Sequence, residues 1–160
     1  MRPLPSSLDR SSVKTVLFLC TGNYYRSRFA EEFFNNLAIA RGLNWRADSA
    51  GLDPTPANPG PISRYTLEAF ARLNLARPAS ERFPRRVTNE DFAAADLVIA
   101  VKEVEHRPMM VKWFAERLAE VEFWQVHDID CAAPCDTIAD LEERVAELVE
   151  RLRSPSTLAA

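Results

Sequence analysis

The feature that most constrains the fold is a short apolar run that leads into a loop and then into an amphipathic helix. Residues 16–19 read Val-Leu-Phe-Leu and are followed at once by Cys20. A run of this length without polar alternation is typical of a parallel strand that is covered on both faces. From Ser27 onward, apolar residues recur at helical spacing, which predicts an amphipathic helix. These residues are Phe29, Ala30, Phe33, Phe34, Leu37 and Ala38.

The rest of the chain repeats this alternation, which indicates an α/β fold with a parallel sheet. Further strands are predicted at residues 45–49, 96–101 and 121–126. Further helices are predicted at residues 63–73, 89–94, 108–118 and 137–152. Pro108 suits the first turn of its helix, and residues 137–140 resemble a capping box that ends in Asp rather than Glu. We expect one domain over residues 13–153, with tails at 1–12 and 154–160.

Composition argues against several classes of function. The chain has 160 residues and a net charge of −3, with no basic patch long enough to predict nucleic-acid binding. No apolar run is long enough to span a membrane, and the polar N-terminus holds no signal-peptide core. Three cysteines (Cys20, Cys131 and Cys135) and two histidines do not suggest a disulfide framework or a zinc site. We expect a cytoplasmic protein that is a monomer or a weak dimer.

The loop after the first strand carries the residue types that phosphoryl transfer requires. Gly22 and Asn23 tolerate positive φ, so the backbone can turn tightly around an anion. The helix that follows presents free N–H groups and the positive end of its dipole, which favour a phosphate. Arg26 is placed to grip two phosphate oxygens, and these positive surroundings favour the thiolate form of Cys20 as a nucleophile. Ser27 can donate its hydroxyl to that thiolate.

The expected phosphate-binding loop comprises Thr21, Gly22, Asn23, Tyr24, Tyr25, Arg26 and Ser27. A Cys-x5-Arg spacing also arises by chance, in which case Cys20 is an ordinary apolar residue at the end of a strand. Here a buried strand precedes the spacing and an amphipathic helix follows it, which is the structural context that such a motif needs.

These residues resemble the signature of a known family. Residues 16–31, VLFLCTGNYYRSRFAE, are similar to the signature of the low-molecular-weight protein tyrosine phosphatases, whose fold thioredoxin-coupled arsenate reductases share. Looser similarities follow at residues 48–51, 86–92 and 96–100. The resemblance implies a three-layer α/β fold, called phosphotyrosine protein phosphatase I-like, in which helices flank a four-stranded parallel sheet. It also implies a cysteinyl-phosphate mechanism that uses no metal and no other cofactor.

The same resemblance assigns roles by position. Cys20 matches the nucleophile, and Arg26 matches the residue that binds the phosphate oxygens. Asn23 and Ser49 match residues that keep the loop in shape. Ser27 matches the serine that stabilises the thiolate.

The leaving oxygen needs a proton donor. In the family this donor is an aspartate in the loop after the last strand, usually followed by proline. Asp128 falls at the matching position, although Ile129 replaces the proline. Asp130 is the alternative acid, and we favour Asp128 because of its spacing from the end of the strand. Either aspartate can instead serve the turn itself.

One residue of the loop, Tyr25, departs from the family pattern, and two later cysteines bear on the consequence. Tyr25 stands where many members carry a second cysteine, so a disulfide between neighbours in this loop cannot form. A reversible bond from Cys20 to Cys131 or Cys135 under oxidising conditions is one hypothesis; ordinary structural thiols are the alternative. Tyr24 and Tyr25 either wall a pocket for flat aryl phosphates or pack against neighbouring loops.

The function predicted from these residues is phosphomonoester hydrolysis, acting on phosphorylated proteins, above all on phosphotyrosine, or on small aryl phosphates. An arsenate reductase is a second hypothesis, but the resemblance would then place a further cysteine where Val101 stands. A weakened phosphate- or phosphopeptide-binding module is a third. Ile129 motivates it, as do Lys102 and Arg82, which replace an aspartate and a histidine that family members often have.

Overall fold

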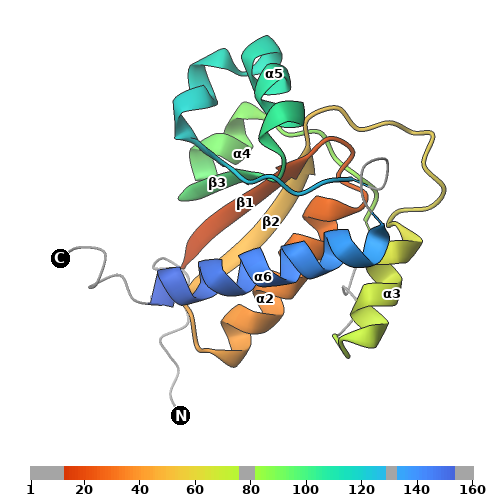
Figure 1. Ribbon diagram of the computed structural model, residues 1–160. Helices are drawn as coiled ribbons and strands as arrows, with labels where there is room; N and C mark the ends of the chain where they lie inside the picture. The colour runs from red at the N-terminus through yellow and green to blue at the C-terminus, as the bar shows by residue number, and fades with distance from the viewer. Residues whose placement is uncertain (1–12, 76–81, 129–132, 154–160) are drawn as a thin grey trace.

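Four parallel strands form the centre of the molecule (Figure 1). The computed structural model describes residues 13–75, 82–128 and 133–153. Within these ranges the strand order is β2-β1-β3-β4, and every pair of neighbours is parallel. The strands are β1 (Lys14–Cys20), β2 (Trp45–Gly51), β3 (Leu97–Ala100) and β4 (Val121–Phe123). The predicted α/β fold with a four-stranded parallel sheet is confirmed.

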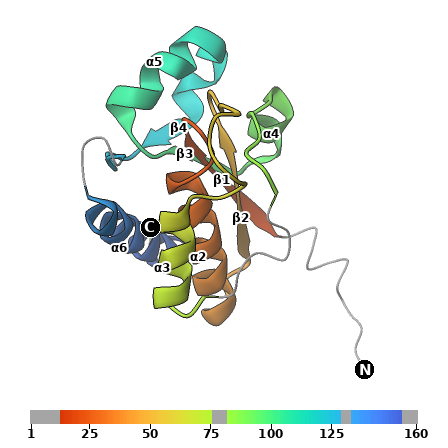
Figure 2. The same cartoon turned by 90° about the vertical axis from the view of Figure 1, so that its right-hand side faces the viewer.

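Helices cover both faces of this sheet (Figure 2). One layer consists of α2 (Arg26–Ala40), α3 (Arg64–Arg72) and α6 (Pro134–Arg153). The opposite layer consists of α4 (Asn89–Ala94), α5 (Glu103–Trp113) and the 3-10 helix η1 (Ala115–Glu120). The three predicted layers are therefore present.

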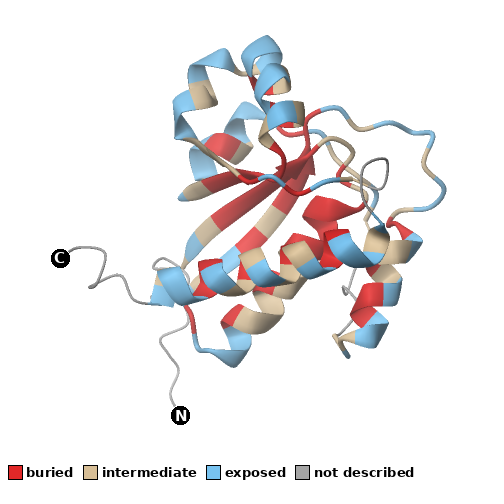
Figure 3. Ribbon diagram, viewed as in Figure 1, coloured by how far each residue is buried: buried red, intermediate tan, exposed pale blue. Residues whose placement is uncertain are grey.

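The side chains of β1 separate two hydrophobic cores, one on each face of the sheet. Val16 and Phe18 pack in the core that α2 and α6 cover, whereas Leu17 and Leu19 pack in the core that α4 and α5 cover. Successive side chains of a strand point to opposite faces, so an unbroken apolar run fills both cores. Figure 3 shows this burial along the strands and on the inner faces of the helices.

The prediction that a helix begins at Pro108 was wrong. Helix α5 begins at Glu103, directly after β3, and Pro108 lies inside it. Proline cannot donate the helical hydrogen bond to the carbonyl four residues earlier, which is that of Val104. Both residues are exposed, so water can solvate this carbonyl.

The predicted capping box at residues 137–140 was also wrong. Helix α6 begins at Pro134, which occupies the first helical position that proline favours. The Thr137 hydroxyl donates to the carbonyl of His127 at 2.9 Å instead of capping the helix. The last residue of the expected box, Asp140, pairs with Arg144 one turn further along.

Strands β3 and β4 are shorter than the predicted ranges 96–101 and 121–126. Beyond these strands the two segments are still hydrogen bonded; the Val126 N–H, for example, donates to the Val101 carbonyl at 2.7 Å. Lys102 and Gln125, however, form an isolated antiparallel bridge, so the parallel ladder ends here.

The strand order of the sheet reverses at β1, which makes its carboxyl end the topological switch point. Strand β2 lies on one side of β1 and β3 on the other. In open α/β sheets, ligands bind beyond the carboxyl ends of the strands at such a point. Cys20 is the last residue of β1 and occupies this position. In the described ranges, none of the helices has both the length and the apolar character needed to cross a membrane.

Candidate active site

Cys20 lies at the base of the loop that joins β1 to α2. Its side chain is nearly buried, with 2% of the residue exposed. Its sulfur lies 3.0 Å from the Ser27 hydroxyl and accepts the Asn23 backbone N–H at 3.2 Å. Two polar hydrogens can therefore stabilise negative charge on this sulfur, as predicted for Ser27 from the resemblance.

Asn23 holds the loop together from within. It is fully buried and has a φ of 51°, the left-handed conformation that asparagine tolerates better than most residues. Its Nδ2 donates to the hydroxyls of Ser27 and Ser49, each at 2.9 Å. Its Oδ1 accepts from Arg82 Nη1 at 2.9 Å and from the Arg85 backbone N–H at 3.1 Å. One side chain thus ties the loop to β2 and to the segment before α4.

A second tier of contacts fixes Ser49. Its hydroxyl donates to Glu31 Oε1 at 2.6 Å, and Arg82 Nη2 donates to the Ser49 carbonyl at 3.0 Å. Burial raises the pKa of Glu31, against the opposing effects of the Ser49 hydroxyl and the Arg82 charge. Arg82, which was singled out as a departure from the resemblance, therefore takes part in this network.

Of the two loop residues expected to tolerate a positive φ, Gly22 and Asn23, only Asn23 adopts one. The glycine that the loop depends on sterically is Gly51, at the end of β2. A Cβ there would lie 2.8 Å from the Thr21 carbonyl oxygen and 3.2 Å from the Asn23 Cβ. A Cβ essentially never lies 2.8 Å from a backbone oxygen, so glycine at this position allows β2 to approach the loop closely.

Arg26 begins α2 and points toward the ends of β3 and β4. Only 2% of the residue is exposed, and its Nη1 donates to the Val126 carbonyl at 3.1 Å. Its Nη2 lies 2.9 Å from Glu105 Oε2 and 3.3 Å from Asp128 Oδ2. Burial alone would lower the pKa of Arg26. The Cys20 sulfur and the carboxylates of Glu105 and Asp128 outweigh burial and raise it.

The structure therefore brings Asp128 to the same site as Cys20 and Arg26. Asp130, the alternative acid, lies outside the described residues, as does Cys131. Cys20 and Cys135 are both free thiols, and Cys135 is exposed. In this structure Cys135 is not bonded to Cys20.

Sequence reasoning missed a polar cluster on α5 that contacts the loop. Glu105 accepts a hydrogen bond from the Thr21 hydroxyl, and His106 Nε2 lies 3.2 Å from Glu105 Oε2. Burial would raise the pKa of Glu105, but hydrogen bonds from His106 and Arg26 and the charge of Arg26 hold it well below its usual range. Glu105 is therefore ionised. The signal for this cluster was its position directly after a strand whose carboxyl end lies beside Cys20.

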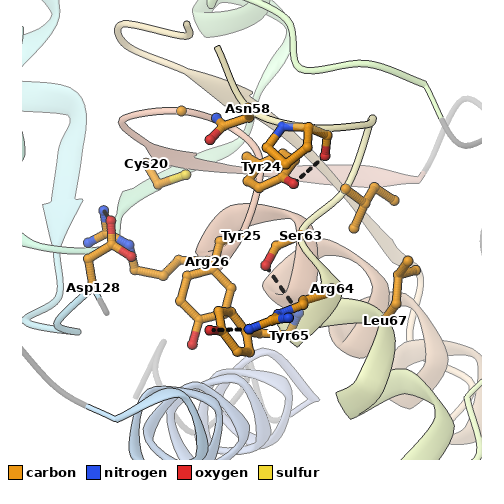
Figure 4. Close-up of a pocket in the computed structure, with 13 residues that line it drawn as sticks. Cys20, Tyr24, Tyr25, Arg26, Asn58, Ser63, Arg64, Tyr65, Leu67 and Asp128 are labelled. Atoms are coloured by element: carbon orange, nitrogen blue, oxygen red, sulfur yellow. Dashed lines mark hydrogen bonds and ion pairs between the residues drawn. The ribbon is translucent and has the colours of Figure 1, made fainter. Parts of the chain in front are cut away.

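A cavity of about 540 Å³ opens beside the loop, within the usual size range of small-ligand sites. Figure 4 shows Arg26 and Asp128 at one end, near Cys20, and Leu67 at the other. Three aromatic side chains contribute to the wall. These are Tyr24, Tyr25 and Tyr65. The two predicted alternatives for Tyr24 and Tyr25 are both present, since the two side chains line this cavity and also contact neighbouring segments. The Tyr24 hydroxyl donates to the Pro59 carbonyl, and the Tyr25 ring packs against Tyr65.

Tyr25 is held in place in the wall of this cavity. Its ring centroid lies 5.9 Å from that of Tyr65, and its hydroxyl donates to the Pro134 carbonyl at 3.3 Å. Burial raises the pKa of Tyr25 to about 12, so its hydroxyl stays neutral. Among the described residues, no group of three or more His, Cys, Asp or Glu side chains is arranged to hold a metal ion.

Known proteins are similar to this chain in sequence and in fold. The family model described as "Low molecular weight phosphotyrosine protein phosphatase" matches residues 15–155. Curated relatives include a protein-arginine-phosphatase of Bacillus subtilis, 31% identical over 99 residues that cover 62% of each chain. They also include the human low molecular weight phosphotyrosine protein phosphatase, 31% identical over 105 residues that cover 64% of this chain and 63% of the relative. The chain thus spans less than two thirds of the length of the curated relatives it matches.

Solved structures agree over more of the chain. A low molecular weight protein tyrosine phosphatase from T. tengcongensis has a TM-score of 0.72 at 26% identity, covering 86% of this chain and 99% of that one. A mutant of YwlE from Bacillus subtilis has a TM-score of 0.73 at 25% identity, covering 88% and 99%. Because the family model matches most of the chain, this protein belongs to the low molecular weight phosphotyrosine protein phosphatase family.

Proposed function

We propose that this protein hydrolyses phosphomonoesters, acting on phosphotyrosine in proteins or on small aryl phosphates. One observation carries the proposal. The thiol of Cys20, the buried guanidinium of Arg26 and the carboxylate of Asp128 meet at the end of one cavity that three tyrosine side chains help to line. These are a nucleophile, a phosphate-binding group and a proton donor, which together suffice for ester hydrolysis through a covalent intermediate.

In the first step the Cys20 thiolate attacks phosphorus. An S–P bond forms and the bond between phosphorus and the aryl oxygen breaks, while protonated Asp128 gives its proton to that oxygen. Arg26 and the backbone N–H groups of residues 21–27 stabilise the charge on the three remaining phosphate oxygens. The products of this step are the free phenol and a cysteinyl phosphate.

In the second step Asp128, now a carboxylate, takes a proton from water. The water oxygen attacks phosphorus, the S–P bond breaks, and the thiolate of Cys20 is regenerated as inorganic phosphate leaves. Hydrogen bonds from the Ser27 hydroxyl and the Asn23 N–H stabilise this thiolate as it departs. The cycle consumes one water and needs no cofactor.

The pocket favours an aryl phosphate over phosphoarginine, the substrate suggested by the name of one relative. The three tyrosine rings suit a flat phenyl group. The Arg64 guanidinium also lines the pocket, 5.0 Å from the Tyr65 ring centroid, and would repel the guanidinium of a phosphoarginine side chain.

The two other functions receive less support. An arsenate reductase needs further thiols near the nucleophile, and the buried side chain of Val101 occupies the position expected for one. A module that only binds phosphate would not need the thiol of Cys20 and the carboxylate of Asp128 to face the same cavity.

Turnover of p-nitrophenyl phosphate tests the proposal. We expect Cys20→Ser to lower kcat by about 10³-fold or more, because the intermediate cannot form. Cys135→Ser is the matched control and should leave kcat unchanged, since Cys135 is exposed and does not line the cavity. Hydrolysis that persists in Cys20→Ser would contradict the mechanism. Faster hydrolysis of phosphoarginine than of phosphotyrosine peptides would contradict the substrate assignment.

A further inference from the structure

The guanidinium of Arg26 presents two different edges to its surroundings. The end-on edge, formed by Nη1 and Nη2, donates to the two carboxylate oxygens of Glu105 at 3.3 and 2.9 Å. The other Nη1 hydrogen is used by the Val126 carbonyl at 3.1 Å. The side edge, formed by Nε and the second Nη2 hydrogen, is the one left for another two-point partner. Of the described residues, Asp128 engages the Nη2 half of this edge, at 3.3 Å.

Glu105 is itself fixed by its neighbours. His106 is fully buried, and its Nδ1 accepts the Lys102 backbone N–H at 3.1 Å, so its proton is carried by Nε2. This Nε2 lies 3.2 Å from Glu105 Oε2 and 3.1 Å from the Thr21 hydroxyl oxygen. The Thr21 hydroxyl in turn donates to Glu105 Oε2. One carboxylate oxygen thus has three donors around it, from Arg26, Thr21 and His106.

We propose that Glu105 is a positioning residue for Arg26, which turns the Nε–Nη2 edge of the guanidinium toward the phosphate. The inference rests on the proposed phosphatase function. Because the guanidinium is planar and rigid, fixing its end-on edge also fixes its side edge. Glu105 does not compete with the phosphate, since the two groups bind different edges of Arg26.

Substituting Glu105 by Gln separates positioning from simple binding. The substitution removes a negative charge beside the phosphate site, so the affinity for a phosphate dianion should not fall. It also replaces one acceptor of the Arg26 fork by an amide N–H₂, which cannot accept, so the guanidinium loses its fixed orientation. We therefore expect kcat for p-nitrophenyl phosphate to fall about 10- to 100-fold, with no rise in KM or in the inhibition constant of inorganic phosphate.

Two further variants sharpen this test. Glu105→Asp keeps the charge but is one methylene shorter, so its kcat should lie between those of the wild type and Glu105→Gln. Glu103→Gln makes the same change of charge on the same helix, at a residue that pairs with exposed Arg107 at 2.7 Å. Its kcat should stay within about twofold of the wild type, as expected when an exposed pair is removed.

The orientation of Arg26 can also be measured without turnover. In the wild type, the Nε–Hε NMR signal of Arg26, assigned by its loss in Arg26→Lys, should shift when inorganic phosphate is added. In Glu105→Gln the same signal should be broadened, and its response to phosphate reduced. If the wild type hydrolyses no aryl phosphate, the proposed function is refuted. The Arg26 Nε–Hε signal would still show whether Glu105 orients the guanidinium, because that measurement does not depend on turnover.

Three results would overturn the inference. The first is an unchanged kcat in Glu105→Gln. The second is a parallel loss of kcat and of phosphate affinity, which would indicate general damage to the site. The third is an Arg26 signal that is the same in Glu105→Gln and in the wild type.

Discussion

Replacing Asn23 with glycine tests whether one side chain maintains the shape of the catalytic loop. Glycine adopts the φ of 51° without strain, so the backbone conformation stays accessible when the side chain is removed. The substitution removes four hydrogen bonds from a fully buried site. They join Asn23 to Ser27, Ser49, Arg82 and the Arg85 backbone.

The expected loss of stability follows from these bonds. A hydrogen bond in a protein contributes about 1 kcal/mol net, so four of them amount to about 4 kcal/mol. That is a large part of the roughly 5–15 kcal/mol by which proteins of this size are stable. Asn23→Ala should lose about 1 kcal/mol more, because alanine is strained at this positive φ.

Urea unfolding followed by tryptophan fluorescence measures this loss as a lower midpoint with an unchanged slope. The chain supplies its own control in Asn74, which has a φ of 60° but is exposed and makes no side-chain hydrogen bond to a described residue. Asn74→Gly should cost less than about 0.5 kcal/mol, as surface substitutions usually do. If Asn23→Gly costs no more than Asn74→Gly, the network does not stabilise the loop and the reasoning is refuted.

Two further predictions concern carboxylates. Asp128→Asn should lower kcat for phenyl phosphate by about 10²- to 10⁴-fold and for p-nitrophenyl phosphate by less, because p-nitrophenolate leaves readily without a proton. Asp130→Asn should spare both substrates, and the reverse ranking would assign the acid to Asp130. Burial, together with the charge of Glu31, raises the pKa of Glu32 to about 7. The pKa of this carboxyl is lower in the unfolded chain, so its ionisation destabilises the fold as the pH rises from that lower pKa toward 7. Glu32→Gln should therefore be more stable than the wild type by about 1–2 kcal/mol at pH 8, a figure that allows for solvent exposure of this side chain. At pH 4 the two proteins should be equally stable. Urea unfolding at both pH values measures the difference, and equal gains at both would contradict the raised pKa of Glu32.

The strand, loop and helix around Cys20 could be predicted because their signals are local. An unbroken apolar run indicates a strand buried on both faces whatever packs against it, and β1 has that burial. The partners of Asn23 could not be derived in this way. Ser49 was expected from family resemblance alone, and the hydrogen bonds of Asn23 to Arg82 and Arg85 join residues about 60 positions apart.

Glu105 was missed for a related reason. A proline is common in the first turn of a helix, and that preference placed the start of this helix at Pro108. The true start at Glu103 puts Glu105 in the first helical turn after β3. This turn lies at the carboxyl ends of the strands, where Cys20 also lies. Propensity alone could not reveal this, because the packing of α5 against the sheet outweighs the hydrogen bond that the proline removes.

The division of Arg26 between two carboxylates bears on how the site would accept its substrate. Asp128 uses Nη2 on the side edge that is proposed to bind phosphate, whereas Glu105 uses the adjacent end-on edge formed by Nη1 and Nη2. On the proposed mechanism, a phosphate that binds the Nε–Nη2 edge of Arg26 would displace Asp128 from Nη2 and leave the contact with Glu105 intact. Asp128 would then be free to protonate the leaving oxygen, while the guanidinium keeps its orientation. The proposed mechanism thus gives the two carboxylates separate roles, in which Glu105 orients Arg26 and Asp128 transfers the proton.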